Sequence, residues 1–177
     1  MLVVILLVIC CRQAGEASFG VQFDDKYDAG IPLHEYVKKA CMPAPDHREN
    51  KKTVAIFIEF LRFGCLACLN EFLDFCDTLK AVSDAYGNVG VILIFKRDHQ
   101  EEDQQYRQMK SWIKGTGLNF RFRIAPPELF DENHITEISL LILDRNYEFN
   151  YYNQFPLTMR KKEEILGILC EGVRRDR

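Results

Sequence analysis

Two cysteines three positions apart, Cys65 and Cys68, lie in the segment FGCLACLNEF of residues 63–72. This spacing fits a redox-active dithiol, half of a zinc site, or a chance feature of the composition. A zinc site would need two further ligands at suitable spacing, but there is no second CxxC and no paired histidine motif. The four histidines are scattered along the chain at His34, His47, His99 and His134. The pattern therefore favours redox chemistry, if the neighbouring elements position both thiols.

The predicted elements on either side of the pair would activate it. TVAIFIEF, residues 53–60, is a nearly unbroken apolar run typical of a strand buried on both faces. The residues from 68 to 87 place apolar side chains at helical steps. Cys65 is then expected at a helix N-terminus, where unpaired N–H groups stabilise a thiolate and lower a cysteine pKa from about 8.5 to between about 3.5 and 7.5. Cys65 would attack and Cys68, one turn further on, would resolve the mixed disulfide, while Gly64 leaves room for a partner's backbone.

An acidic residue in the strand adds a proton carrier. Glu59 interrupts the apolar run six positions before Cys65. A carboxyl group among Ile and Phe side chains holds its proton more readily than in water, and could relay a proton to Cys68. The alternative is that the strand end bends and turns Glu59 out into solvent.

The remaining patterns predict an α/β fold. Strands are expected at 89–95, 119–124, 138–144 and 147–152, the last two as a hairpin; helices are expected at 33–40, 101–117 and 158–173; and 125–137 is expected to be a proline-led loop. A strand–helix–strand order requires a parallel pair with a right-handed crossover, and the hairpin adds antiparallel strands. The prediction is a mixed sheet with helices on both faces.

This order of elements, the CxxC after the first strand and the acid upstream resemble the thioredoxin fold. CLACLNE, with Glu71 three residues past Cys68, is similar to the CxxCxxE pattern of the TlpA/ResA branch of exported thiol–disulfide oxidoreductases, relatives of the redoxin and AhpC/TSA proteins. The resemblance covers residues 53–170. It implies a three-layer α/β/α fold with an inserted helix and strand at 101–124, and disulfide exchange with protein substrates and a membrane thiol–disulfide relay. It implies no organic cofactor and no metal.

The sequence departs from that family at three places. Gly64 stands where the family has Trp, and Leu66 and Ala67 replace the Pro- or Gly-containing pair between the cysteines. The family's cis-proline, which faces the dithiol, would fall near Ile138, but no proline lies between Pro127 and Pro156. We therefore expect less efficient turnover and a changed redox potential.

The N-terminus has the pattern of an export signal. Residues 2–11, LVVILLVICC, form an apolar run of signal-peptide length, which resembles a bacterial lipoprotein signal with Cys11, or else Cys10, as the lipidated residue. The alternatives are a buried strand or an uncleaved anchor. We predict an exported, periplasmic or cell-envelope protein with a signal segment at 1–11, a linker and extension at 12–52 and the thioredoxin-like domain at 53–174. The net charge of −3 provides no broad basic surface for nucleic acid.

Three other functions remain open. A peroxiredoxin would have Thr three residues before its reactive cysteine, where this chain has Arg62. A copper carrier could use both thiolates and His134. A non-catalytic binding module would keep the fold without the reaction. Cys76 and Cys170 are expected to be core thiols, and Cys41 could pair with another cysteine.

Overall fold

Strand β1 (Lys52–Ile58) lies at the centre of a five-stranded sheet of order β3-β2-β1-β4-β5. The structure is a computed structural model and describes residues 30–41, 52–59, 66–87, 89–97, 102–118, 120–135, 138–144, 148–152 and 155–170. The other strands are β2 (Val89–Lys96), β3 (Arg121–Ala125), β4 (Ile138–Asp144) and β5 (Phe149–Tyr152).

The sheet is mixed, as predicted. β1 pairs in parallel with β2, and β2 pairs in parallel with β3. On the other side, β4 runs antiparallel to β1 and β5 antiparallel to β4. The carboxyl ends of β1 and β2 therefore lie at the same edge of the sheet as the start of β4.

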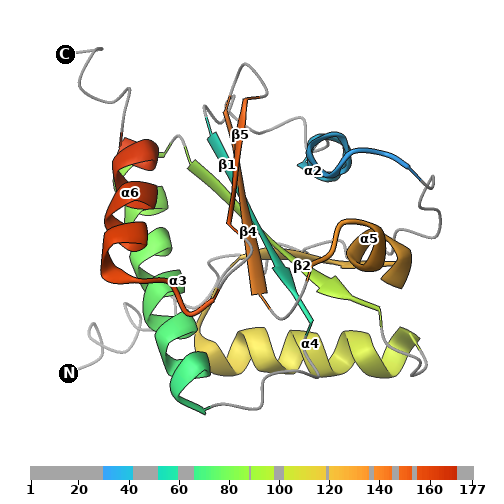
Figure 1. The fold of residues 1–177 in the computed structure, drawn as a ribbon. Helices are drawn as coiled ribbons and strands as arrows, with labels where there is room; N and C mark the ends of the chain where they lie inside the picture. Colours follow the sequence, from blue (N-terminus) through green and yellow to red (C-terminus); the bar gives the residue numbers. More distant parts are fainter. Residues whose placement is uncertain are drawn as a thin grey trace, which may run out of the picture.

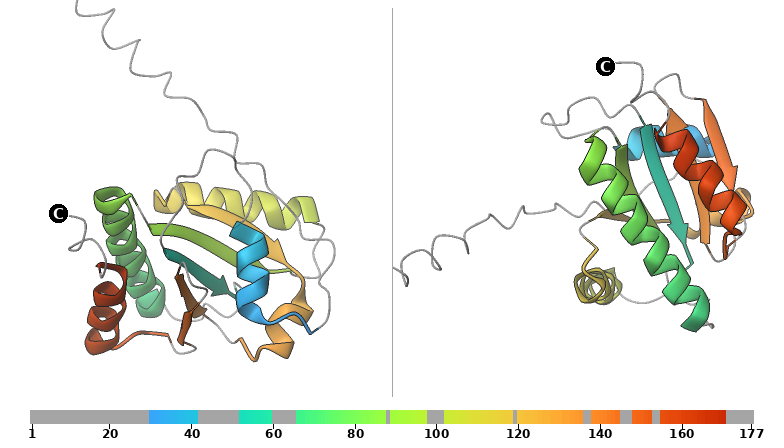
Figure 2. Two further views of the ribbon diagram at one scale, coloured as in Figure 1. Left: turned by 90° about the horizontal axis from the view of Figure 1, so that it is seen from above. Right: turned by 90° about the vertical axis from the view of Figure 1, so that its left-hand side faces the viewer.

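Helices cover both faces of the sheet and make three layers (Figures 1 and 2). One face packs against α3 (Leu66–Tyr86), α4 (Glu102–Thr116) and α6 (Met159–Cys170). The other face packs against α2 (Leu33–Cys41) and α5 (Pro127–Glu132). The α/β/α architecture predicted from the sequence is confirmed.

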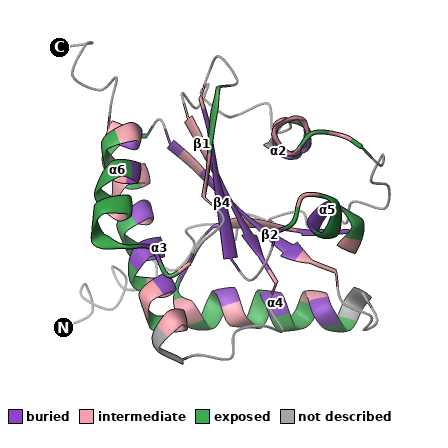
Figure 3. Ribbon diagram, viewed as in Figure 1, coloured by how far each residue is buried: buried purple, intermediate pink, exposed green. Residues whose placement is uncertain are grey.

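Alternation along β1 explains why two helical layers form. Val54, Ile56 and Ile58 belong to the core on the α3 side, whereas Ala55 and Phe57 belong to the core on the α5 side. All five side chains are fully buried, which a two-faced apolar strand requires. β1, β2 and β4 are buried along most of their length, whereas the helices alternate between buried and exposed residues (Figure 3).

The predicted insertion is present. α4 and β3 follow β2 directly, and β3 extends the sheet in parallel beyond β2. α4 packs through Met109 and Ile113, while Trp112 stacks on Phe72 of α3 at 6.3 Å between ring centroids. The helix ends at Thr116, and Gly117 follows it with a φ of 72°, a value that suits glycine.

One predicted loop is wrong. Residues 125–137 contain the helix α5, which begins at Pro127 and buries Leu129 and Phe130 completely. Proline fits the first turn of a helix because the N–H that it lacks has no intrahelical acceptor there. At six residues, α5 is too short to give a periodic signal.

The helix at the N-terminal end of the described chain is present as predicted. α2 packs Tyr36, Val37 and Ala40 against the sheet. The predicted domain start at residue 53 falls at the second residue of β1. Residues 1–11, with Cys10 and Cys11, lie outside the described residues. Within the part of the chain that is described, no helix is both long and apolar enough to cross a bilayer.

We predict that Phe72→Ala lowers the free energy of unfolding by about 3–5 kcal/mol, because it leaves a cavity where α3 meets α4. Phe72 is fully buried and contacts both Trp112 and Phe155. Urea unfolding followed by far-ultraviolet circular dichroism measures the change. Phe149→Ala, at a side chain that is 51% exposed, is the control and should cost less than about 1 kcal/mol. Equal losses in the two variants would contradict the packing described here.

Candidate active site

Cys68, the second cysteine of the pair, lies near the start of α3. α3 begins at Leu66, so Cys68 is in its first turn, where it is a half-buried thiol. Cys65, the residue before the helix in sequence, lies outside the described residues. β1 ends at Ile58 and α3 begins at Leu66, so a strand precedes Cys65 in the sequence and a helix follows it.

The start of α3 suits a sulfur anion. The helix has 21 residues and no acidic side chain in its first turn. The aligned peptide dipoles place a partial positive charge at this end, and no carboxylate of that turn opposes it. α3 connects two parallel strands, so its first turn lies at the edge where those strands end, at the lower end of the molecule in Figure 1.

Glu59 follows β1 directly and is not turned out into solvent. Its side chain is 15% exposed, and its Oε1 lies 3.4 Å from the Lys96 Nζ atom. The register of β1 and β2 produces this contact: Ile58 pairs with Phe95, so the next residues of two parallel strands are neighbours on the same face. An ammonium group thus balances the carboxylate in a setting that would otherwise disfavour its charge.

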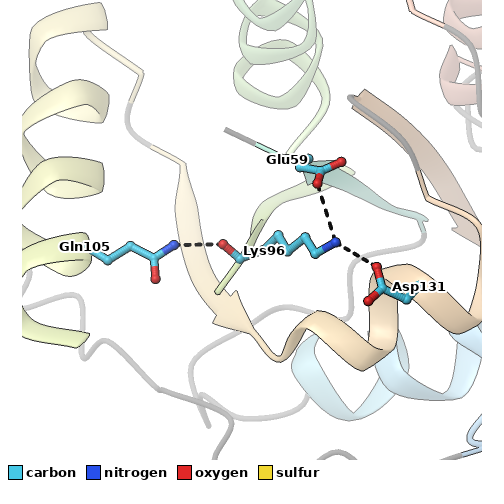
Figure 4. A network of polar contacts seen from close by, with 4 residues as sticks. All are labelled: Glu59, Lys96, Gln105 and Asp131. Carbon is cyan, nitrogen blue, oxygen red and sulfur yellow. Dashed lines mark hydrogen bonds and ion pairs between the residues drawn. The ribbon is translucent and has the colours of Figure 1, made fainter. Parts of the chain in front are cut away.

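A second carboxylate binds the same ammonium group. Asp131 of α5 contacts the Lys96 Nζ atom through Oδ1 at 2.7 Å, a shorter distance than that to Glu59 (Figure 4). Partial burial lowers the pKa of Lys96, but the Asp131 hydrogen bond and the charges of Glu59 and Asp131 outweigh it, so the pKa is raised. Lys96 therefore stays protonated at neutral pH.

The inserted helix holds the backbone at this point. Gln105 of α4 is buried, and its Nε2 donates to the Lys96 carbonyl oxygen at 2.7 Å. Figure 4 shows the resulting network, which draws together β1, β2, α4 and α5. The insertion thus fixes the end of β2 from which the ammonium extends.

Glu71, the acid of the CxxCxxE pattern, makes a structural contact. Its Oε1 lies 2.7 Å from the Lys162 Nζ atom, which ties α3 to the first turn of α6. At the position expected to hold a cis-proline, Ile138 starts β4 and pairs with Ile58. Ile138 is buried, next to the strand end that carries Glu59.

The other candidate ligand and the other thiols lie in different surroundings. His134 is exposed in the turn after α5, with φ of 51°. Across the described residues, no group of three or more His, Cys, Asp or Glu side chains could hold a metal ion. Cys76 is fully buried in the core, and Cys170 is half-buried near the end of α6.

Sequence reasoning missed Lys96, Asp131 and Gln105. Lys96 had a usable signal, because a charged residue ends the apolar run VGVILIFK just as Glu59 ends that of β1. Asp131 had none, because its segment was predicted to be a loop. Gln105 is one of several polar residues of its helix, and only the packing distinguishes it.

No protein-family model matches the sequence. No curated protein matches it either. Solved structures do match. A secreted thiol–disulfide isomerase from Corynebacterium glutamicum aligns with a TM-score of 0.52 at 15% identity, covering 70% of this chain and 73% of that one.

Two further structures are similar. A thioredoxin-like protein in its oxidised form has a TM-score of 0.52 at 13% identity, with 85% of this chain and 92% of that one covered. A secreted disulfide oxidoreductase from Mycobacterium tuberculosis has a TM-score of 0.49 at 17% identity, with 69% and 82% covered. The two structures with TM-scores of 0.52 identify the fold of this chain, which is that of thioredoxin.

We predict that brief treatment of the folded protein with iodoacetamide at mildly alkaline pH leaves Cys76 unmodified. Burial, and after it the charge of Asp77, raises the pKa of this thiol far above its ordinary value, so the reactive thiolate does not form. Denaturant should make Cys76 react at the rate of an exposed cysteine. Peptide mass spectrometry measures the modification at each site. Alkylation of Cys76 at equal rates in the folded and unfolded chains would contradict the assigned burial.

Proposed function

We propose that this chain, which has the thioredoxin fold, is a thiol–disulfide oxidoreductase that exchanges disulfides with other proteins. One observation carries the proposal: the second cysteine of a CxxC pair lies in the first turn of a long helix that follows the central strand. The names of the similar structures, a thiol–disulfide isomerase and a disulfide oxidoreductase, support the same reaction class.

In the reducing direction, the Cys65 thiolate attacks one sulfur of a substrate disulfide. A new S–S bond joins Cys65 to the substrate, and the other substrate sulfur leaves as a thiolate that takes a proton from solvent. The Cys68 thiolate then attacks the Cys65 sulfur. The Cys65–Cys68 disulfide forms, the second substrate thiolate leaves, and two electrons have passed from the dithiol to the substrate. Oxidation of a substrate is the same sequence in reverse.

Glu59 manages the proton of the second step. Cys68 must lose a proton before it attacks, and the leaving substrate sulfur must gain one. The Glu59 carboxylate accepts the first proton and returns it to the leaving thiolate, directly or through water. The reaction needs no organic cofactor and no metal. Whether the protein reduces or oxidises is set by its partner, for which we propose a membrane thiol–disulfide relay.

Export belongs to the same proposal. The apolar run at 2–11 followed by a polar segment supports a cleaved signal, with Cys11 or Cys10 as the lipidated residue. Similar structures include secreted proteins and an exposed lipoprotein thioredoxin from Streptococcus pneumoniae, which supports an extracytoplasmic setting. Disulfide exchange also suits a compartment in which disulfides persist.

We predict that the protein accelerates insulin reduction by dithiothreitol, and that Cys65→Ser returns the rate to background because the attacking sulfur is lost. Cys68→Ser should accumulate a mixed disulfide with the substrate, seen on non-reducing gels. Glu59→Gln should slow turnover roughly 10²-fold, the usual contribution of a positioned acid–base group. Turbidity of the precipitating insulin chains gives the rates.

Cys170→Ser, which removes a thiol outside the pair, is the matched control and should keep the wild-type rate. An intact protein without activity would favour the non-catalytic binding module. Consumption of hydrogen peroxide through Cys65 would favour the peroxiredoxin. Tight Cu(I) binding that is lost in His134→Ala would favour the copper carrier.

We predict that Cys11→Ser abolishes lipid attachment when the full chain is expressed in a bacterium that processes lipoproteins, because the acceptor sulfur is gone. The protein should then move from the membrane fraction to the exported soluble fraction. Mass spectrometry of the N-terminal peptide identifies the modified residue. Cys10→Ser is the control and should stay with the membrane; the opposite result would place the lipid on Cys10. An unmodified, uncleaved N-terminus would contradict the export proposal.

A further inference from the structure

The Lys96 ammonium group is shared unequally between two carboxylates. Its Nζ atom lies 2.7 Å from the Asp131 Oδ1 atom and 3.4 Å from the Glu59 Oε1 atom. The side chains of Lys96 and Glu59 are 20% and 15% exposed, whereas that of Asp131 is 67% exposed. The better-solvated acid thus makes the shorter bond, and the mostly buried acid that follows β1 keeps the longer one.

We propose that Asp131 is a positioning residue for disulfide exchange: it draws the Lys96 ammonium group away from Glu59 and so leaves the Glu59 carboxylate basic enough to take the Cys68 proton. This inference rests on the proposed function. It adds to that function a residue of α5 that acts through Lys96.

The groups that surround the Lys96 ammonium group limit where it can lie. The Lys96 backbone is held by the Gln105 side chain, and its ammonium lies 5.9 Å from the centre of the Phe130 ring. The charged groups that act on it are Glu59 at the end of β1 and Asp131 on α5, while α4 contributes a neutral amide. The Lys96 ammonium group therefore interacts with both of these carboxylates.

How closely the Lys96 ammonium group pairs with Glu59 decides how readily the Glu59 carboxylate accepts a proton. A carboxylate fully paired with an ammonium group is stabilised in its charged form and accepts a proton only at lower pH. A carboxylate left without a cation in a mostly buried site takes up a proton at higher pH. The 3.4 Å contact with Lys96 places Glu59 between these two arrangements, and the proposal is that Asp131 maintains this distance.

The test is the pH dependence of Glu59 in Asp131→Asn. The Glu59 carboxyl is titrated by carbon-13 NMR, with Glu59→Gln to identify its signal, and the acid limb of insulin reduction is followed in parallel. Without Asp131 the Lys96 ammonium group moves to Glu59. The midpoint of the Glu59 titration and the midpoint of the acid limb should therefore both fall by roughly 0.5 pH unit or more. Glu128→Gln removes an exposed acid from the same helix and is the matched control; it should leave both midpoints unchanged.

A double substitution separates action through Lys96 from direct repulsion between the two acids. Lys96→Gln alone should raise the midpoint of Glu59, and Asp131→Asn added to it should change nothing further. An equal fall with and without Lys96 would overturn the inference, as would an unchanged midpoint in Asp131→Asn alone. If Lys96→Gln does not fold, Lys96→Met keeps the apolar stem beside Phe130 and replaces it.

The failure of this inference and that of the proposed function give different results. If the wild-type protein reduces no disulfide at any pH, the proposed function fails, and the NMR titration still reports whether Asp131 controls Glu59 through Lys96. If the wild-type protein is active but Asp131→Asn merely lowers its stability, with both midpoints unchanged, Asp131 is only an anchor for α5 and the inference fails alone.

Discussion

The parallel pairing of β1 with β2 is the constraint on which the candidate site depends. Because Ile58 pairs with Phe95, the residues that follow, Glu59 and Lys96, are neighbours on one face at this edge of the sheet. The same pairing requires the connecting helix α3 to return along the sheet, which brings its first turn to the edge where the strands end. A one-residue slip would separate the acid from its cation and also reverse the buried faces of β1.

Placing a carboxylate at this edge is costly, and the network offsets the cost. A mostly buried carboxylate is stable only with a hydrogen-bonding or charged partner, and the long side chain of Lys96 supplies one without bringing its backbone close. Removing one member of such a pair leaves an uncompensated charge. The contacts from α4 and α5 are therefore part of the candidate site, although neither helix carries a cysteine.

How far the sequence predicts this structure depends on the range of the interactions. Long apolar runs and helical steps are local signals, so the strands and the long helices were found with boundaries close to those observed. α5 was missed because a short helix that buries two side chains is held by tertiary packing. The position of Cys68 near a helix start follows from local spacing. Lys96 lies 37 residues from Glu59 and 35 from Asp131, and only the strand register and the packing of α5 bring these residues together.

Two cysteines of α3 show that position, more than residue type, decides what a thiol does. Cys68 and Cys76 belong to the same helix, two turns apart. Cys76 faces the apolar core, where burial and the charge of Asp77 raise its thiol pKa, so its sulfur packs as a small apolar group. Cys68 lies at the positive end of the helix dipole and is half-buried. One helix therefore gives two chemically identical thiols different surroundings, because it buries one in the core and places the other in its first turn.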